Sequence, residues 1–272
     1  MSMDESPWLR VGWFSTGRGP GSRALFRAIC AAIDGGMPVE LAYVFCNREP
    51  GEDAQTDRLF ALVRERGVPL LTLSSAAFRK RAGGTIARKG EPLPQWRLDY
   101  DAAVLKLVEP RGAALGVLAG YMLIFGARAC ERLTLLNLHP AAPGGPIGMW
   151  QDVIWQLIAA RAAQSGITIF RAIPEVDAGP PLSFCTYSLR GPDIDPLWAE
   201  AAGRTIEQLK AEAGEELPLF KEIRRRGAER EPVLIVETLR AVAERGLPSA
   251  GEVMDLTALV DARLAAQMPR RS

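Results

Sequence analysis

The sequence predicts an α/β fold: a mostly parallel sheet with an antiparallel edge, followed by a helical C-terminal appendage. Short apolar, β-favouring runs alternate with segments of helical period through the first two thirds of the chain. A glycine-rich turn follows the first apolar run, as a strand leading into a loop requires. From residue 195 onward the chain is rich in Ala, Glu, Arg and Leu. We therefore expect an α/β domain over residues 1–192 and a helical extension over residues 193–272.

The first half of the chain shows the alternation most clearly. The apolar run 9–15 predicts the first strand, and it stops at the glycine-rich turn 16–21. Ser22 is a good N-cap residue for the helix that follows, which should end at Gly35. Alternating elements then follow: strand 39–46, helix 53–66, strand 68–73, helix 98–108, strand 115–121, helix 127–132 and strand 133–138. The basic, Gly- and Pro-containing segment 79–97 has no period and predicts an exposed loop.

The second half predicts the antiparallel edge and the helical extension. A helix over 149–164 precedes strands 167–173 and 182–189, and the short connection between these strands favours an antiparallel pair. Helical segments should then cover residues 196–214, 217–227, 231–245 and 250–267.

Composition excludes several classes of protein. The 272 residues include 33 basic and 32 acidic side chains, so no global field draws the chain to nucleic acid. The longest apolar stretch, 113–127, is shorter than the roughly 20 residues that cross a bilayer. The N-terminus carries acidic residues where a signal peptide has positive charge. We expect a cytoplasmic protein that binds neither membrane nor nucleic acid.

The four cysteines and the single histidine narrow the chemistry further. The cysteines lie far apart without a CxxC pair, which gives little support to a disulfide framework or a zinc site. His139 is the only histidine, so mechanisms that need two imidazoles are excluded by count. No metal is expected.

The glycine loop after the first strand is a candidate anion site. Glycines let backbone N–H groups approach a phosphate, and a helix that begins there points the positive end of its dipole at the same place. Arg18 and Arg23 could add charge-assisted hydrogen bonds. The loop lacks the Lys of a P-loop and the regular GxGxxG spacing. A tight turn that serves only packing is the alternative interpretation.

Asn137, His139 and Asp177 form a second candidate constellation. Asn137 and His139 are two positions apart on a predicted strand, so their side chains project from one face. An amide N–H can hold the oxyanion of a tetrahedral intermediate, and an imidazole can move the proton that an attacking amine loses. Asp177 follows the next strand, and a carboxylate there would orient the imidazole. A His-Pro at a strand end is by itself more often structural.

Residues 9–190 resemble the folate-dependent formyltransferases, most closely those of the phosphoribosylglycinamide type. The matching segments occur in the family's order: GPGSR at 19–23, FCN at 45–47, LAGYM at 118–122, LNLHP at 136–140, SGIT at 165–168 and VDAGP at 176–180. The pair formed by Asn-x-His-Pro and the later Asp-x-Gly-Pro is the specific part. The resemblance implies a Rossmann-like sheet of the formyltransferase fold.

The resemblance implies a reaction and a role for each matching residue. A formyl group would pass from 10-formyltetrahydrofolate, a co-substrate, to an amine, with Asn137, His139 and Asp177 as the catalytic residues. Gly19, Gly21, Ser22 and Arg23 match the loop that holds the substrate phosphate. The folate pocket would be lined by the segment after strand 115–121 and by the 176–179 loop, namely Tyr121, Met122, Leu123, Ile124, Val176, Ala178 and Gly179. Glycinamide ribonucleotide, in purine biosynthesis, is the leading acceptor.

Departures from the family pattern leave alternatives open. Leu123 stands where the family usually has arginine, the glycine loop has an extra residue, and the segment after His139-Pro140 is shorter. Within the family, another amine or water could be the acceptor, and a homodimer is one assembly to test. Outside it, an NADP-dependent oxidoreductase that uses Arg48 for the 2′-phosphate, or a non-catalytic folate- or nucleotide-binding protein, would also fit.

Overall fold

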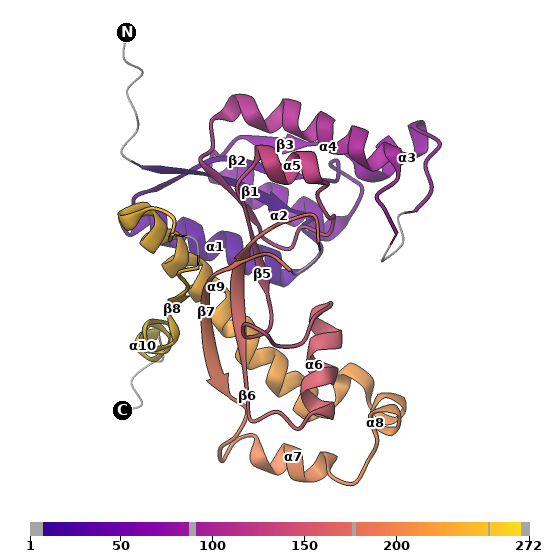
Figure 1. Ribbon diagram of the computed structural model, residues 1–272, viewed down its shortest axis with the longest axis vertical. Coiled ribbons are helices and arrows are strands. Elements are labelled where there is room, and N and C mark those ends of the chain that lie inside the picture. The colour runs from indigo at the N-terminus through magenta and orange to yellow at the C-terminus, as the bar shows by residue number, and fades with distance from the viewer. Residues whose placement is uncertain (1–7, 87–90, 176–177, 250, 268–272) are drawn as a thin grey trace. The chain divides into compact units, whose positions relative to one another are not determined.

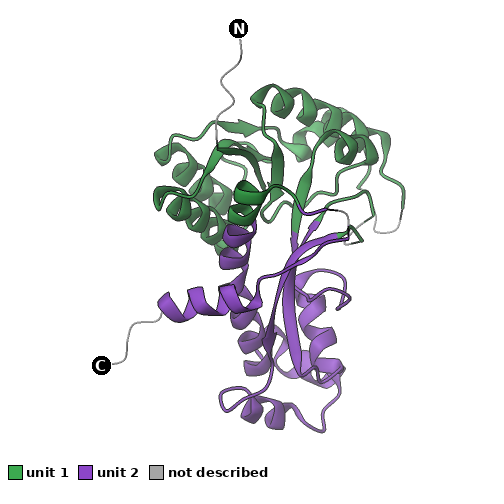
Figure 2. Ribbon diagram, turned by 60° about the vertical axis from the view of Figure 1, so that its left-hand side comes forward, with its two compact units in different colours: residues 1–137, 171–180, 239–247 green, residues 138–170, 181–238, 248–272 purple. Residues whose placement is uncertain are grey.

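The computed structural model of the chain describes residues 8–86, 91–175, 178–249 and 251–267. These residues belong to two compact units, drawn in green and purple in Figure 2. Unit 1 comprises residues 1–137, 171–180 and 239–247, and unit 2 comprises residues 138–170, 181–238 and 248–272. The predicted boundary between an α/β domain and a helical extension, at residues 192/193, stays a prediction.

Unit 1 is built on parallel strands in the order β3-β2-β1-β4-β5. The strands are β1 (Leu9–Ser15), β2 (Val39–Cys46), β3 (Leu70–Thr72), β4 (Leu115–Leu118) and β5 (Leu135–His139), of which the last two residues of β5 belong to unit 2. The helices are α1 (Pro20–Asp34), α2 (Ala54–Glu65), α3 (Ser75–Arg81), α4 (Gln95–Val108) and α5 (Ala127–Arg132), with a 3-10 turn at Glu109–Arg111. Helices α1 and α2 lie on one side of these strands, and α3, α4 and α5 on the other (Figure 1).

The centre of unit 1 is an aromatic cluster around Phe14 on β1. Its ring centroid lies 5.6 to 5.9 Å from those of Phe45, Tyr43, Phe125 and Tyr121. Most of these contacts are edge-to-face, the arrangement that aromatic quadrupoles favour. Strand β1 is buried on both faces from Val11 to Ser15, which explains why its sequence is a continuous apolar run rather than an alternating one.

Unit 2 contains the antiparallel pair. Strands β6 (Gln164–Arg171) and β7 (Pro181–Ser188) run antiparallel, and β8 (Met254–Asp255) pairs with β7 in parallel. The helices are α6 (Trp150–Ala159), α7 (Asp195–Ala201), α8 (Ile206–Glu212), α9 (Pro218–Arg245) and α10 (Thr257–Gln267), with a 3-10 turn at Gly214–Glu216; the last turns of α9 belong to unit 1. The predicted α/β class, with parallel strands, an antiparallel pair and C-terminal helices, is confirmed.

Several predicted boundaries are wrong, and the C-terminal region differs most. The sequence missed β8, because two residues carry no detectable alternation. It also divided α9 into two segments, whereas the helix continues through Pro232. A proline inside a helix costs about 3 kcal/mol, but Leu234 and Ile235 directly after it are buried, as are Leu219 and Phe220 near the start. Burial on both sides of the proline outweighs the local penalty.

The remaining corrections concern loops and element ends. The predicted loop 79–97 is helical at both ends, where α3 finishes at Arg81 and α4 begins at Gln95. Helix α6 ends at Ala159 instead of residue 164, because β6 already begins at Gln164. Among the described residues, no helix is both long and apolar enough to cross a membrane.

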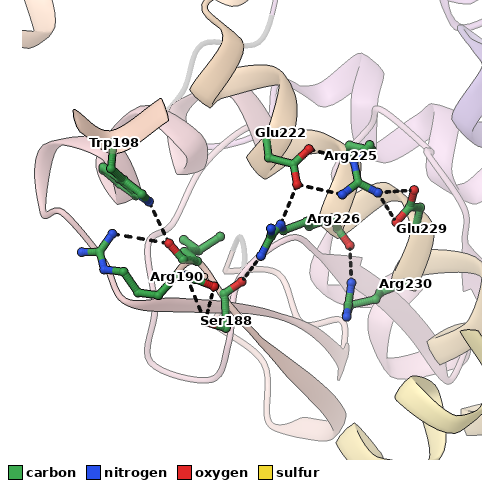
Figure 3. Close-up of polar contacts among 9 residues, drawn as sticks. Ser188, Arg190, Trp198, Glu222, Arg225, Arg226, Glu229 and Arg230 are labelled. Carbon is green, nitrogen blue, oxygen red and sulfur yellow. Dashed lines mark hydrogen bonds and ion pairs between the residues drawn. The ribbon is translucent and has the colours of Figure 1, made fainter. Parts of the chain in front are cut away.

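Glu222 on α9 offers a test of how unit 2 is stabilised. It accepts hydrogen bonds from Arg225 and Arg226, each at 2.7 Å (Figure 3). The Arg225 hydrogen bond, with a smaller contribution from Arg226, lowers the pKa of Glu222 from 4.5 to about 2 against the opposing effect of burial. Because the folded state favours the carboxylate, this contribution is present above pH 4.5 and is lost as the pH falls towards 2.

We therefore expect Glu222→Gln to lower the free energy of unfolding by about 1–3 kcal/mol at pH 7 and by progressively less at lower pH. Urea denaturation of both proteins across this pH range measures the difference. Glu216→Gln is the matched control, since Glu216 pairs with Lys221 but its side chain is 80% exposed and such pairs contribute little. An equal pH dependence for the two variants would contradict the assignment.

Candidate functional site

The glycine loop lies between the carboxyl end of β1 and the first turn of α1. Helix α1 begins at Pro20, with Gly19 as N-cap, so the prediction of Ser22 as N-cap is wrong. Proline suits the first helical position because it lacks the N–H that would be unpaired there. No side chain caps this N-terminus among the described residues. The free N–H groups and the helix dipole of a 15-residue helix favour an anion at this place.

The other residues of the loop are held close to α2. Gly17 has φ +70°, and a Cβ there would lie 3.1 Å from the Cα of Thr56, so glycine is required. Gly21, Ser22 and Arg23 are half-buried. Arg23 donates from its guanidinium to the backbone oxygen of Gln55 at 3.3 Å. The candidate phosphate site therefore has a fixed backbone and one guanidinium beside it.

Thr16 connects the glycine loop to the segment that follows β4. Its N–H donates to the backbone oxygen of Gly120 at 3.1 Å, and its hydroxyl accepts from the N–H of Met122 at 2.9 Å. Gly120 itself lies close to Ser22: a Cβ added at Gly120 would lie 2.7 Å from the Ser22 hydroxyl oxygen. The glycine loop and the segment after β4 thus lie side by side in unit 1. Nothing in the sequence indicated that Thr16 joins them.

The candidate folate segment, Tyr121–Ile124, combines a buried ring with exposed apolar side chains. The Tyr121 ring is stacked on that of Phe125, with centroids 5.1 Å apart. Burial raises the pKa of Tyr121 well above 10, so this hydroxyl stays protonated at neutral pH. Leu123 packs against the aromatic cluster, whereas Met122 and Ile124 are 40% and 42% exposed. Exposed apolar side chains next to a polar loop suit a ligand with a flat, partly apolar ring.

A buried ion pair holds the end of this segment. Arg97 and Asp101, one turn apart on α4, lie 3.2 Å from each other, and both side chains are at most 5% exposed. Arg97 also donates to the backbone oxygen of Ile124 at 2.6 Å, and Asp101 accepts from the N–H of Gly126 at 2.8 Å. Burial raises the pKa of Asp101, although Arg97 opposes that shift. The sequence shows only an i,i+4 pair of the kind common on helix surfaces, so it gave no sign of this role.

Asn137 and His139 lie on the same strand, β5, as predicted. They are two positions apart, so their side chains leave the strand on one face. Asn137 pairs in register with Leu118, the last residue of β4, and its side chain is partly exposed. The Asn137 amide therefore lies at the carboxyl end of parallel strands, where open α/β sheets bind ligands.

His139 is held by the loop that follows it in unit 2. Its side chain is buried, and its Nε2 lies 2.8 Å from the backbone oxygen of Pro146. A carbonyl oxygen only accepts hydrogen bonds, so Nε2 carries the proton in this contact. The Phe170 ring lies 6.3 Å from the imidazole, and Thr168 donates to the backbone oxygen of Ala141 at 2.7 Å, which fixes the loop against β6.

The second loop of the predicted site is described only in part. Val176 and Asp177 lie outside the described residues. Ala178 is exposed and Gly179 half-buried, and the Ala178 N–H donates to the backbone oxygen of Glu175 at 3.4 Å. The approach of Asp177 to His139 stays a prediction. Among the residues that the structure describes, no three His, Cys, Asp or Glu side chains could together hold a metal ion, and metal-free chemistry likewise stays a prediction.

The fold is that of an α/β protein, and the candidate residues described above lie at or after the carboxyl ends of its strands. Residues 14–186, more than half of the chain, match the formyl transferase family. The chain belongs to this family. No curated protein matches it significantly.

Solved structures agree with this assignment at the level of the fold. Glycinamide ribonucleotide transformylase 1 from Symbiobacterium toebii aligns with a TM-score of 0.62 at 21% identity, covering 93% of this chain and 96% of its own. Phosphoribosylglycinamide formyltransferase from Coxiella burnetii gives 0.62 at 19% identity, covering 91% and 99%. A formyltetrahydrofolate deformylase from Pseudomonas syringae pv. tomato gives 0.60 at 18% identity, covering 90% of this chain and 65% of its own.

The Arg97–Asp101 pair can be tested by removing one charge. We expect Asp101→Asn to lower the free energy of unfolding by about 3 kcal/mol, because it leaves the Arg97 charge buried without its partner. Hydrogen–deuterium exchange should also become faster in the peptide that contains residues 121–126, whose Gly126 N–H loses a charged acceptor. The double variant Arg97→Met/Asp101→Leu, measured by the same methods, should recover much of the stability. An unchanged exchange rate in Asp101→Asn would show that the pair does not hold the segment.

Proposed function

We propose that this protein transfers a formyl group from 10-formyltetrahydrofolate to the amine of a small phosphorylated acceptor. Glycinamide ribonucleotide is the first candidate, which would place the reaction in purine biosynthesis and in the cytoplasm. The observation that carries the proposal is the position of Asn137 and His139 on one face of β5, at the carboxyl end of parallel strands. The formyl transferase family membership supports the reaction class.

The proposed chemistry assigns one task to each catalytic residue. The acceptor nitrogen attacks the formyl carbon, and the carbonyl oxygen becomes an oxyanion, which the Asn137 amide and the His139 imidazole stabilise by donating hydrogen bonds. The bond to N10 then breaks, and the proton lost by the acceptor amine passes to N10. Asp177 would favour the protonated form of His139 through its negative charge. In that form Nδ1 also carries a proton, so it can donate to the oxyanion while Nε2 donates to the backbone oxygen of Pro146.

The glycine loop supports a phosphorylated acceptor. The uncapped start of α1 provides backbone N–H groups, and Gly21, Ser22 and Arg23 lie in its first turn. Gly19 and Gly21 leave room for the phosphate oxygens next to the backbone. The folate would contact Tyr121, Met122, Leu123 and Ile124, together with Val176, Ala178 and Gly179. In this arrangement Thr16 links the two ligand sites, because it belongs to the glycine-rich turn and hydrogen-bonds to the segment that would contact the folate.

Water is the second candidate acceptor. The likeness to a solved formyltetrahydrofolate deformylase, together with Leu123 in place of the family's usual arginine, supports hydrolysis to formate and tetrahydrofolate. The same Asn137 and His139 would then stabilise the oxyanion formed by attack of water. The two candidates differ only in whether turnover requires an amine.

The test is release of the formyl group from 10-formyltetrahydrofolate, followed as tetrahydrofolate absorbance with and without glycinamide ribonucleotide. We expect turnover that depends on the ribonucleotide. Asn137→Asp keeps the size of the side chain but removes the N–H donor, so it should lower kcat by about 10²–10³-fold. His139→Ala should have an effect of similar or greater size, since it removes an oxyanion donor that carries a positive charge.

Gln164→Glu is the matched control, because it also removes an amide donor but lies exposed at the start of β6. Its activity should equal that of the unaltered protein. Turnover without any amine would favour hydrolysis, and full activity of Asn137→Asp would reject the site. A homodimer can be sought in the same preparations by light scattering.

A further inference from the structure

Unit 2 contains a cavity that the proposed reaction does not use. It has a volume of about 400 Å³ and lies beside the end of the β6–β7 pair at which β6 begins and β7 finishes. That volume falls within the range of small-molecule sites. Three arginines are among the residues that line it, namely Arg161 after α6, Arg190 after β7 and Arg204 before α8. Neither Asn137 nor His139 belongs to its lining.

One wall of the cavity is a rigid pair of side chains. The Arg190 guanidinium lies over the Trp198 ring, 4.7 Å from its centroid. Arg190 donates to the backbone oxygen of Arg161 at 2.7 Å. Trp198 donates to the backbone oxygen of Leu189 at 2.7 Å, and Arg190 donates to the same oxygen at 3.4 Å (Figure 3). The partners of the Arg190 guanidinium in these contacts are two backbone oxygens and the Trp198 ring. All three are uncharged, so they do not neutralise the positive charge of Arg190.

Arg204 has a different environment. It donates to the Glu212 carboxylate at 2.8 Å and to the backbone oxygen of Glu200. Its charge is therefore compensated. Asp195, at the start of α7, places a carboxylate in the same lining. The three guanidinium groups together with the carboxylates of Asp195 and Glu212 leave a net charge of about +1 at the cavity.

Arg161 occupies a backbone position that favours glycine. Helix α6 ends in a Schellman motif: the Arg161 N–H donates to the backbone oxygen of Ile158 at 3.1 Å, and the Ala162 N–H to that of Leu157 at 3.0 Å. The φ of Arg161 is +46°, and no other non-glycine residue in the described ranges has a positive φ. An arginine thus stands where glycine would be less strained. Arg161 is one of the residues that line the cavity.

We infer that this cavity binds a small organic carboxylate with an apolar body. The excess of one positive charge suits a monoanion, and a guanidinium matches a carboxylate through two parallel hydrogen bonds. The rest of the lining includes Ile158, Ile206, Leu209 and the Trp198 ring, which suit an apolar body rather than a sugar or a free inorganic ion. Arg161 provides the charge that recognises the carboxylate, and Arg190 adds a second, fixed cation.

The site can be followed directly through Trp198. The protein has six tryptophans, so incorporation of 5-fluorotryptophan gives a small set of ¹⁹F resonances, and Trp198→Phe assigns the one that matters. Benzoate is the probe, benzamide is its uncharged analogue, and acetate carries the charge without the apolar body. We expect benzoate to shift the Trp198 resonance saturably. Benzamide and acetate should each bind at least about tenfold more weakly.

Arg161→Gly removes the guanidinium while keeping the backbone of the Schellman motif. It should unfold at the same temperature as the unaltered protein or higher, and its Kd for benzoate should rise at least about tenfold. Arg161→Asn, whose side chain also tolerates positive φ, should weaken binding equally. Arg225→Gln is the control: it removes a guanidinium from the same unit at a position that does not line this cavity, so binding should be unchanged.

Three results would overturn the inference: no saturable shift of Trp198 with benzoate, binding of acetate as tight as that of benzoate, or unchanged affinity in both Arg161 variants. Each readout is a binding measurement on Trp198, so it does not depend on whether the protein transfers formyl groups. Loss of formyl transfer in the β5 variants would likewise leave this site untouched.

Discussion

The contacts of Thr16 are the constraint on which the candidate site in unit 1 depends. This buried residue directly follows β1, and its N–H, side-chain oxygen and backbone oxygen each make a hydrogen bond, to Gly120, Met122 and Thr56 respectively. These three partners belong to the segment after β4 and to α2. A single residue therefore connects the glycine loop to α2 and to the candidate folate segment. Buried polar groups of this kind are stabilising only when all of them are paired.

The Arg97–Asp101 pair plays a complementary part at the far end of that segment. Removing two charges from water is costly, and such pairs often contribute no net stability compared with apolar residues. Here the two side chains also bind the backbone of Ile124 and Gly126. The pair therefore stabilises the conformation of the 121–126 segment. In this conformation the apolar side chains of Met122 and Ile124 are exposed to solvent.

Unit 2 contains the candidate catalytic residue His139 and a cavity that the family assignment does not explain. His139 is oriented by a short loop rich in Gly and Pro, in which Pro146 supplies the carbonyl that fixes the ring. The same unit positions three arginines around a separate cavity. His139 is held by a backbone oxygen, and Arg161 has a positive φ because it stands directly after the C-terminal end of α6, so the surrounding backbone sets the local geometry of both residues.

The sequence by itself determined the α/β class and the position of Asn137 and His139 on one strand. It also determined strands β1 and β2 and helix α5 to the residue. Apolar runs and helical periods are local signals, and a two-residue spacing on a strand needs no tertiary information. Tertiary structure decided the rest. Pro232 lies inside a helix because its neighbours are buried, and β8 exists only because β7 offers it a partner. Thr16, Arg97 and Asp101 look ordinary in the sequence, since their roles come from residues 25 to 106 positions away.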